Sequence, residues 1–229
     1  MLAGAAIILG VIGCTAGAVD RQTLLVARSV LPAVTFRAGS PPSGAFFTAD
    51  ERATAGGNGV SGPASGPFLP GQPIQGFSSM VPADAGTWWT LADNGAGARG
   101  NSADFQLVIH RVDLRWNDPR GPQVLDSIIL RDPDRRIPWT VVCDPGNGNP
   151  LPDFSFNVLP VPPPACGAAA ASRTLTGFDL DPESFVRAPD GTFWIGDEFG
   201  PFLVHTAADG RVLEAPIGVP RVRSPQTRS

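Results

Sequence analysis

The sequence predicts an all-β protein of short antiparallel strands joined by tight turns. Its 229 residues include 27 Gly and 25 Pro, so one of these two residues occurs roughly every four to five positions, against globular helices of ~10–14 residues. This spacing excludes a helical bundle. A hydrophobic fraction of 42%, with 13 Phe and 5 Trp, is too high for a disordered chain and can fill a core.

The charge pattern argues against a nucleic-acid partner. The net charge is −4, and all 17 basic residues are Arg. The nearest approach to a basic run, Arg131 with Arg135 and Arg136, is interrupted by Asp132 and Asp134. Non-specific nucleic-acid binding needs many cationic contacts to phosphate, so we expect no such partner.

The N-terminus predicts export. Residues 1–13 are apolar but too short to span a bilayer, and they resemble the hydrophobic region of an export signal. Val11–Cys14 also resembles a bacterial lipobox, which would lipidate Cys14 and provide the chain's one link to a membrane. We predict a signal over 1–19 and delivery to the periplasm, outer envelope or medium. No basic residue precedes the apolar run, so a buried N-terminal strand is the alternative.

The other two cysteines, Cys143 and Cys166, form an isolated pair. In an exported protein such a pair most often forms a disulfide, which here would close a Pro- and Gly-rich segment. Two free thiols are the alternative. No His or further Cys lies at zinc-ligand spacing.

The strand signals of the first half begin at Phe77. Residues 20–73 are expected to be an irregular lead-in, because 39–73 are rich in Gly, Pro and Ser. Strands are predicted over 77–81, 87–92, 105–116 and 124–130, with turns at 82–86 and 117–121. In the third strand the apolar phase shifts by one residue after Ile109, which predicts a β-bulge near Arg111.

The second half predicts a four-stranded meander over 184–188, 192–196, 202–206 and 211–214. Its turns are 189–191 and 207–210, each with an Asp-Gly pair that favours a hairpin. Gly86-Thr-Trp-Trp, followed by Asp93, is echoed by Gly191-Thr-Phe-Trp, followed by Asp197. Repeated four-stranded units of this kind indicate a β-propeller-like fold, with a β-sandwich as the alternative.

Acidic residues concentrate in 176–200, which holds six of the 21 Asp and Glu. Asp179, Asp181 and Glu183 alternate, so in an extended chain they lie on one face. Asp197 and Glu198 close the neighbouring strand and could reach the same rim. Such oxygen ligands suit Ca²⁺ or Mg²⁺, and a solvated acidic rim without a ligand is the alternative.

Several long motifs resemble the phytase-like esterase family of bacterial exported proteins. They are Leu91-Ala-Asp-Asn-Gly-Ala-Gly-Ala-Arg-Gly-Asn-Ser-Ala-Asp-Phe105, Leu130-Arg-Asp-Pro-Asp-Arg-Arg-Ile-Pro138, Thr176-Gly-Phe-Asp-Leu-Asp-Pro-Glu-Ser184 and Asp190-Gly-Thr-Phe-Trp-Ile-Gly-Asp-Glu-Phe-Gly-Pro-Phe-Leu203. The resemblance spans about residues 70–229. It implies a domain over 74–229 that is similar to β-propeller phytases, which use bound calcium to cleave phosphate esters.

The resemblance also implies roles for individual residues. The expected Ca²⁺ ligands are Asp93, Asp104, Asp179, Asp181, Glu183, Asp197 and Glu198. Glu183, Asp197, Glu198 and His205 are the catalytic candidates, although spacing alone makes His110 and His205 ordinary strand residues. Asn94 and Arg99 are expected to bind the substrate, a phosphate ester or another small ester, with Arg99 where a Lys would be usual.

Two departures from the family pattern leave other functions open. Residues 140–172 are expected to be an insertion, and the pattern reaches the middle of the family domain at 218–225 before the chain stops at Ser229. A blade needs roughly 40–50 residues, so we expect an incomplete, open propeller. The alternatives are a non-catalytic envelope propeller that binds a ligand or partner, and a truncated product without function.

Overall fold

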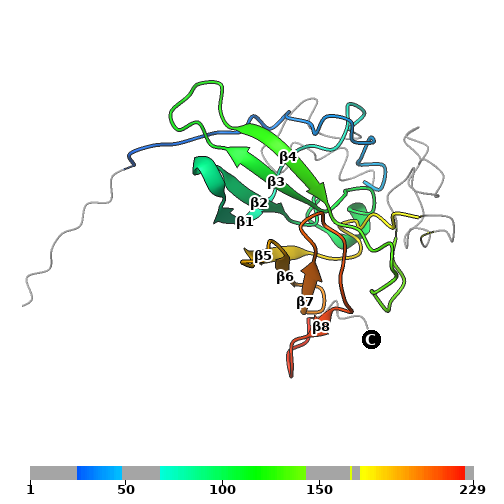
Figure 1. Cartoon of the computed structure of the whole chain (residues 1–229). Coiled ribbons are helices and arrows are strands. Elements are labelled where there is room, and N and C mark those ends of the chain that lie inside the picture. Colours follow the sequence, from blue (N-terminus) through cyan, green and yellow to red (C-terminus); the bar gives the residue numbers. More distant parts are fainter. Residues whose placement is uncertain (1–24, 48–67, 143–165, 167–170, 225–229) are drawn as a thin grey trace, which may run out of the picture.

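The computed structural model describes residues 25–47, 68–142, 166 and 171–224. In these residues the strands form two four-stranded antiparallel sheets, with no α-helix (Figure 1). The predicted all-β class is therefore confirmed. Within the same ranges, no helix is both long and apolar enough to cross a lipid bilayer.

The first sheet is a meander in which each strand pairs with the next. Its strands are β1 (Phe77–Pro82), β2 (Trp88–Ala92), β3 (Val108–Asp113) and β4 (Gln123–Ile129). The pairing of β3 with β4 shifts register between Arg111 and Val112, which confirms the predicted bulge. The third strand is shorter than predicted. Phe105 precedes it in a turn, and Trp116 lies 56% exposed in the connection to β4.

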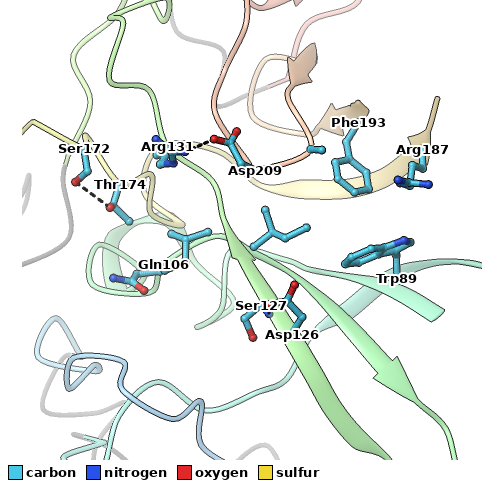
Figure 2. Close-up of a pocket in the computed structure, with 13 residues that line it drawn as sticks. Trp89, Gln106, Asp126, Ser127, Arg131, Ser172, Thr174, Arg187, Phe193 and Asp209 are labelled. Carbon is cyan, nitrogen blue, oxygen red and sulfur yellow. Dashed lines mark hydrogen bonds and ion pairs between the residues drawn. The ribbon is translucent and has the colours of Figure 1, made fainter. Parts of the chain in front are cut away.

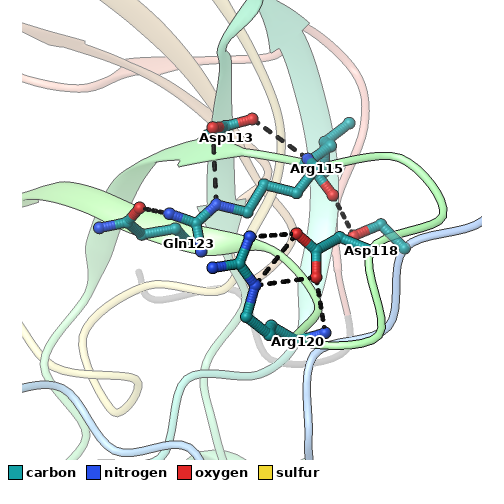
Figure 3. Close-up of polar contacts among 7 residues, drawn as sticks. Asp113, Arg115, Asp118, Arg120 and Gln123 are labelled. Atoms are coloured by element: carbon teal, nitrogen blue, oxygen red, sulfur yellow. Dashed lines mark hydrogen bonds and ion pairs between the residues drawn. The ribbon is translucent and has the colours of Figure 1, made fainter.

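The β3–β4 connection is the predicted turn at 117–121. Asn117 and Gly121 have positive φ angles of 60° and 73°, which Asn and Gly adopt more readily than other residues. Figure 3 shows how polar side chains close this turn: Arg120 forms an ion pair with Asp118 at 2.6 Å, and the backbone N–H of Arg115 donates to Asp113. These charged side chains therefore stabilise the turn.

The second sheet is a meander of β5 (Pro182–Arg187), β6 (Phe193–Asp197), β7 (Phe202–Thr206) and β8 (Ile217–Gly218). The prediction of a fourth strand at 211–214 was wrong. The backbone N–H of Leu213 donates to His205, whereas that of Val212 donates to Arg131, next to the first sheet. Residues 211–213 thus form hydrogen bonds both to β7 and to Arg131 beside the first sheet. The chain pairs with β7 as a strand only at Ile217.

One hydrophobic core joins the two sheets. Leu91 and Ile109 of the first sheet are buried with Phe185, Ile195 and Val204 of the second. The rings of Trp89 and Phe193 meet edge to face across the interface at 5.8 Å, and β5 packs against β1 and β2. Burial of each large apolar side chain stabilises the fold by ~1.5–3 kcal/mol. Neither sheet closes on itself.

The sequence echo marks equivalent strands of the two sheets. Residues 88–92 form β2 and residues 193–197 form β6, each second in its meander. Both follow turns that contain a glycine of positive φ, Gly86 at 74° and Gly191 at 90°. As a result, the acidic residues at the far ends of the two strands occupy equivalent places.

The lead-in packs against the first sheet without forming a strand. In its described part, Phe36 bridges to Pro73 and Ser43 bridges to Phe68. The ring of Phe68 contacts that of Phe105 at 6.1 Å. A second small core contains Ala45, Phe46, Ala103 and Val142, and Phe178 packs against it.

Several predictions fall outside the described residues. The signal over 1–19, Cys14, Cys143 and most of the insertion lie there. Cys166 is disulfide-bonded, and its pairing with Cys143 stays a prediction.

Candidate functional site

Four carboxylates gather where β2 and β6 end and β5 begins. Asp93 follows β2, Asp181 and Glu183 lie at the start of β5, and Glu198 follows β6. Pro182 pairs with Asp197, which brings the start of β5 beside the end of β6. We call Asp93, Asp181, Glu183 and Glu198 the acidic end.

Burial and neighbouring negative charges oppose the ionisation of Asp181 and Glu183. Burial raises the pKa of Asp181, and the charges of Glu198 and Asp93 raise it further, while hydrogen bonds from Asn94 lower it. Burial also raises the pKa of Glu183, as do Asp181, Asp93 and Glu198, against a hydrogen bond from Ser78. Such mutual repulsion is relieved by protonation or by a bound cation.

The acidic end does not itself form a finished metal centre. In the described ranges, no group of three or more His, Cys, Asp or Glu side chains is arranged to hold a metal ion. Glu183 and Glu198 are exposed, whereas Asp93 is half-buried and Asp181 is buried. The two glutamates can therefore change their rotamers without disturbing the core.

Asp197 and Asp179 are buried and hold backbone N–H groups. The Asp197 carboxylate accepts from Asp181 at 2.7 Å and from Gly200 at 2.9 Å, and burial raises its pKa to about 6. The Asp179 carboxylate accepts from Val142 at 2.7 Å and from Thr176 at 3.0 Å. Both side chains thus fix the loops around the acidic end.

Asp104 lies apart from the acidic end, in the small second core. It is 1% exposed, and its Oδ2 accepts from the backbone N–H of Ala45 at 2.8 Å, while its Oδ1 has no hydrogen-bond partner among the described residues. Burial raises its pKa to about 7, with no contribution from the other carboxylates. The structure does not bring Asp104 together with the other predicted ligands.

Asn94, predicted to bind substrate, connects the two sheets. Its backbone N–H and its Nδ2 donate to the two carboxylate oxygens of Asp181 at 3.2 and 2.9 Å, and its Oδ1 accepts from Gly97. A side chain at position 177 would overlap the carbonyl oxygen of Asn94, which is why Gly177 fits there. Asn94 is 5% exposed, so it orients Asp181 and presents little surface to a ligand.

Arg99, the other predicted substrate-binding residue, lies close to Asp197 and Asp179. It opens the short 3₁₀ turn η2 (Arg99–Asn101), and its Nε donates to the carbonyl oxygen of Phe178 at 3.0 Å. Its guanidinium lies 4.6 Å from the ring centroid of Phe178 and 5.5 Å from that of Phe199. Burial lowers its pKa, and the charges of Asp179 and Asp197 raise it. No local pattern in the sequence assigns a role to Phe178 or Phe199, although both lie inside the family motifs.

His205 lies at the other end of the second sheet. Its ring stacks on Trp194 at 4.0 Å and contacts Glu214 and Thr192 at 2.8 and 3.1 Å. On β7, the residue that pairs with Asp197 is Phe202, three positions away from His205. The structure therefore separates His205 from Asp197 and Glu198. His110 is buried against Ser127, and burial lowers its pKa to about 4.

A groove of about 730 Å³ lies between the sheets (Figure 2). Its lining includes the Trp89–Phe193 contact, Asp126, Arg187 and the ion pair of Arg131 with Asp209. No residue of the acidic end lines it. The groove and the acidic end are therefore separate features.

Fold and site together define an all-β protein in which two meander sheets meet at a carboxylate-rich end with an adjacent arginine. Residues 72–229 match the family model described as "Phytase-like: Esterase-like activity of phytase", and the chain belongs to this family. An "Uncharacterized secreted protein" of the fungus Arthroderma benhamiae is 27% identical over 176 residues, which cover 63% of this chain. The match covers 33% of that relative's length. No solved structure matches the chain.

Proposed function

We propose that the protein is an exported hydrolase that cleaves phosphate esters at the acidic end with a divalent cation, Ca²⁺ in the first instance. One observation carries the proposal: four carboxylates gather at the place where equivalent strands of the two sheets end, and the charges of Asp93 and Glu198 raise the pKa values of Asp181 and Glu183. Membership of the phytase-like family and the secreted relative support the reaction class and the export.

The residues of the acidic end fit a hard cation by their chemistry. All four are carboxylates, the ligands that Ca²⁺ and Mg²⁺ prefer. We assign them as the ligands and assign Asp104, Asp179 and Asp197 to the support of the surrounding loops, because those side chains are buried and bonded to backbone N–H groups. Asn94 then orients Asp181.

A bound cation would supply charge stabilisation and lower the pKa of an attacking water molecule. The protein's own groups supply the rest. The Glu198 side chain is exposed, and within the described residues its carboxylate accepts no hydrogen bond, so the oxygen that does not bind the cation can accept a proton from that water. Arg99 offers a fixed positive charge beside the carboxylates for the anionic group of the substrate.

We further propose that the two sheets are neighbouring blades of a β-propeller. Each sheet is a four-stranded meander, β2 and β6 are equivalent in sequence and position, and β5 packs against β1 and β2. Neighbouring blades meet face to face in this way, and their strand ends form a shared rim.

The test is hydrolysis of phosphate monoesters and diesters by the full chain, with Ca²⁺ and with a chelator. We expect turnover that stops on chelation and falls at least tenfold in Glu183→Gln and Glu198→Gln. Asp126→Asn, an exposed acid in the groove, is the control and should leave turnover unchanged. Turnover that resists the chelator and both variants would refute the proposal.

A ligand-binding module without catalysis is the second candidate. The observation that favours it is the lack, in the described residues, of three carboxylates placed as metal ligands. It predicts cation-dependent retention of phosphate esters with no product from any ester of the panel.

A further inference from the structure

We propose that Phe178 and Phe199 are positioning residues that hold the Arg99 guanidinium as a receptor for an oxyanion with two oxygens in reach, such as a phosphate or carboxylate group. The receptor would hold the anionic group of the substrate, so this inference rests on the proposed function. We call Arg99, Phe178 and Phe199 the guanidinium slot.

Three contacts fix the plane of the guanidinium. The Nε–H donates to the Phe178 carbonyl oxygen at 3.0 Å, and the two rings lie 4.6 and 5.5 Å away. Phe199 is 2% exposed, so its own rotamer is set by packing. Phe178 is held by neighbours at both sides, because Gly177 packs against Asn94 and Asp179 is bonded to Val142.

The outer edge of the guanidinium stays available. Of its five N–H donors, the Nε–H is bonded to Phe178, and in the described part of the chain neither Nη atom has a hydrogen-bond or ion-pair partner. Asp179 and Asp197 attract the charge from nearby, but their carboxylates accept backbone N–H groups. The two Nη groups can therefore donate to an incoming ligand.

A planar fork held in this way selects its ligand by shape as well as by charge. Two parallel N–H groups match two oxygens of one phosphate or carboxylate, which a lysine ammonium cannot do. Because the slot is formed before binding, little rotamer freedom remains to be lost when the anion arrives. Phe178 and Phe199 therefore affect anion affinity by holding the Arg99 guanidinium in place.

The test is the affinity of the full chain for inorganic phosphate, with acetate as a second probe, measured by calorimetry in the presence and absence of Ca²⁺. We expect Arg99→Lys to weaken phosphate binding at least tenfold although it keeps the charge. Phe178→Leu should weaken phosphate binding about threefold to tenfold, and Phe178→Tyr, which keeps an aromatic ring, should bind phosphate as the wild type does. Arg187→Lys, an exposed arginine in the groove, is the matched control.

Because Phe199 is buried, Phe199→Leu is informative only with an unchanged melting curve, and the half-buried Phe178 provides the decisive variant. Stronger binding of phosphate than of acetate supports a phosphate receptor, and the reverse order supports a carboxylate receptor. Unchanged affinity in Arg99→Lys or in Phe178→Leu would overturn the slot. Phosphate binding without turnover would leave the slot standing and refute the hydrolase.

Discussion

Replacing Asp104 with Asn should make the protein's stability much less dependent on pH. The Asp104 carboxyl is 1% exposed, its Oδ1 has no hydrogen-bond partner in the described part of the chain, and burial raises its pKa from 3.8 to about 7. The folded state therefore binds a proton more tightly than the unfolded chain. The stability that the protonated group contributes is complete below pH 3.8 and is lost as the pH rises through 7.

The magnitude follows from that pKa. One pKa unit corresponds to about 1.36 kcal/mol, so the shift from 3.8 to about 7 corresponds to about 4 kcal/mol between pH 3.5 and pH 8. Asn cannot ionise, and its Oδ1 can still accept from the Ala45 N–H, as the Asp104 Oδ2 does. The free energy of unfolding of Asp104→Asn should therefore rise relative to that of the wild type by about 4 kcal/mol from pH 3.5 to pH 8.

About 3 kcal/mol of this difference falls between pH 4.5 and pH 8. Urea unfolding at pH 4.5, 6 and 8, with linear extrapolation to water, measures it. The exposed variant Asp126→Asn serves as the control, and its offset from the wild type should hardly change with pH. If the free energies of unfolding of Asp104→Asn and the wild type change in parallel from pH 4.5 to 8, the pKa of Asp104 is not raised by burial and the account of this residue is refuted.

Two further predictions concern stability. Asp197→Asn should destabilise the protein by about 1–3 kcal/mol at pH 7, because one of the backbone N–H groups of Asp181 and Gly200 loses its acceptor; urea titration checks this, and an unchanged midpoint would contradict it. Ile195→Ala should cost about 2–5 kcal/mol, since Ile195 is fully buried in the shared core. Ile217→Ala, at a 47% exposed site on β8, should cost under about 0.5 kcal/mol; equal losses in thermal melts would refute the core assignment.

Local signals predicted most of the strands. Asp-Gly turns and aromatic runs located β6 and β7, and the phase shift located the bulge beside Arg111. The fourth strand of the second sheet was misplaced because Val212 bonds to Arg131. That contact joins residues far apart in the chain, and no local pattern encodes it.

The site was predicted in part for the same reason. Sequence density located Asp181, Glu183 and Glu198, and the echo located Asp93. The sequence could not distinguish these candidate ligands from the supporting carboxylates Asp179, Asp104 and Asp197. The distinction depends on burial and on backbone N–H donors from distant segments. His205 is similar: its motif lies beside Asp197 in the sequence, but β7 carries it to the opposite end of the sheet.

Calcium binding by the full chain tests the central claim most directly. Calorimetry of the wild type at pH 7.5 should show Ca²⁺ bound at the acidic end. The double variant Glu183→Gln/Glu198→Gln should lose at least tenfold in affinity, while Asp126→Asn binds as the wild type does. A chain that binds no Ca²⁺ at millimolar concentration, or a double variant that binds it equally well, would contradict the account.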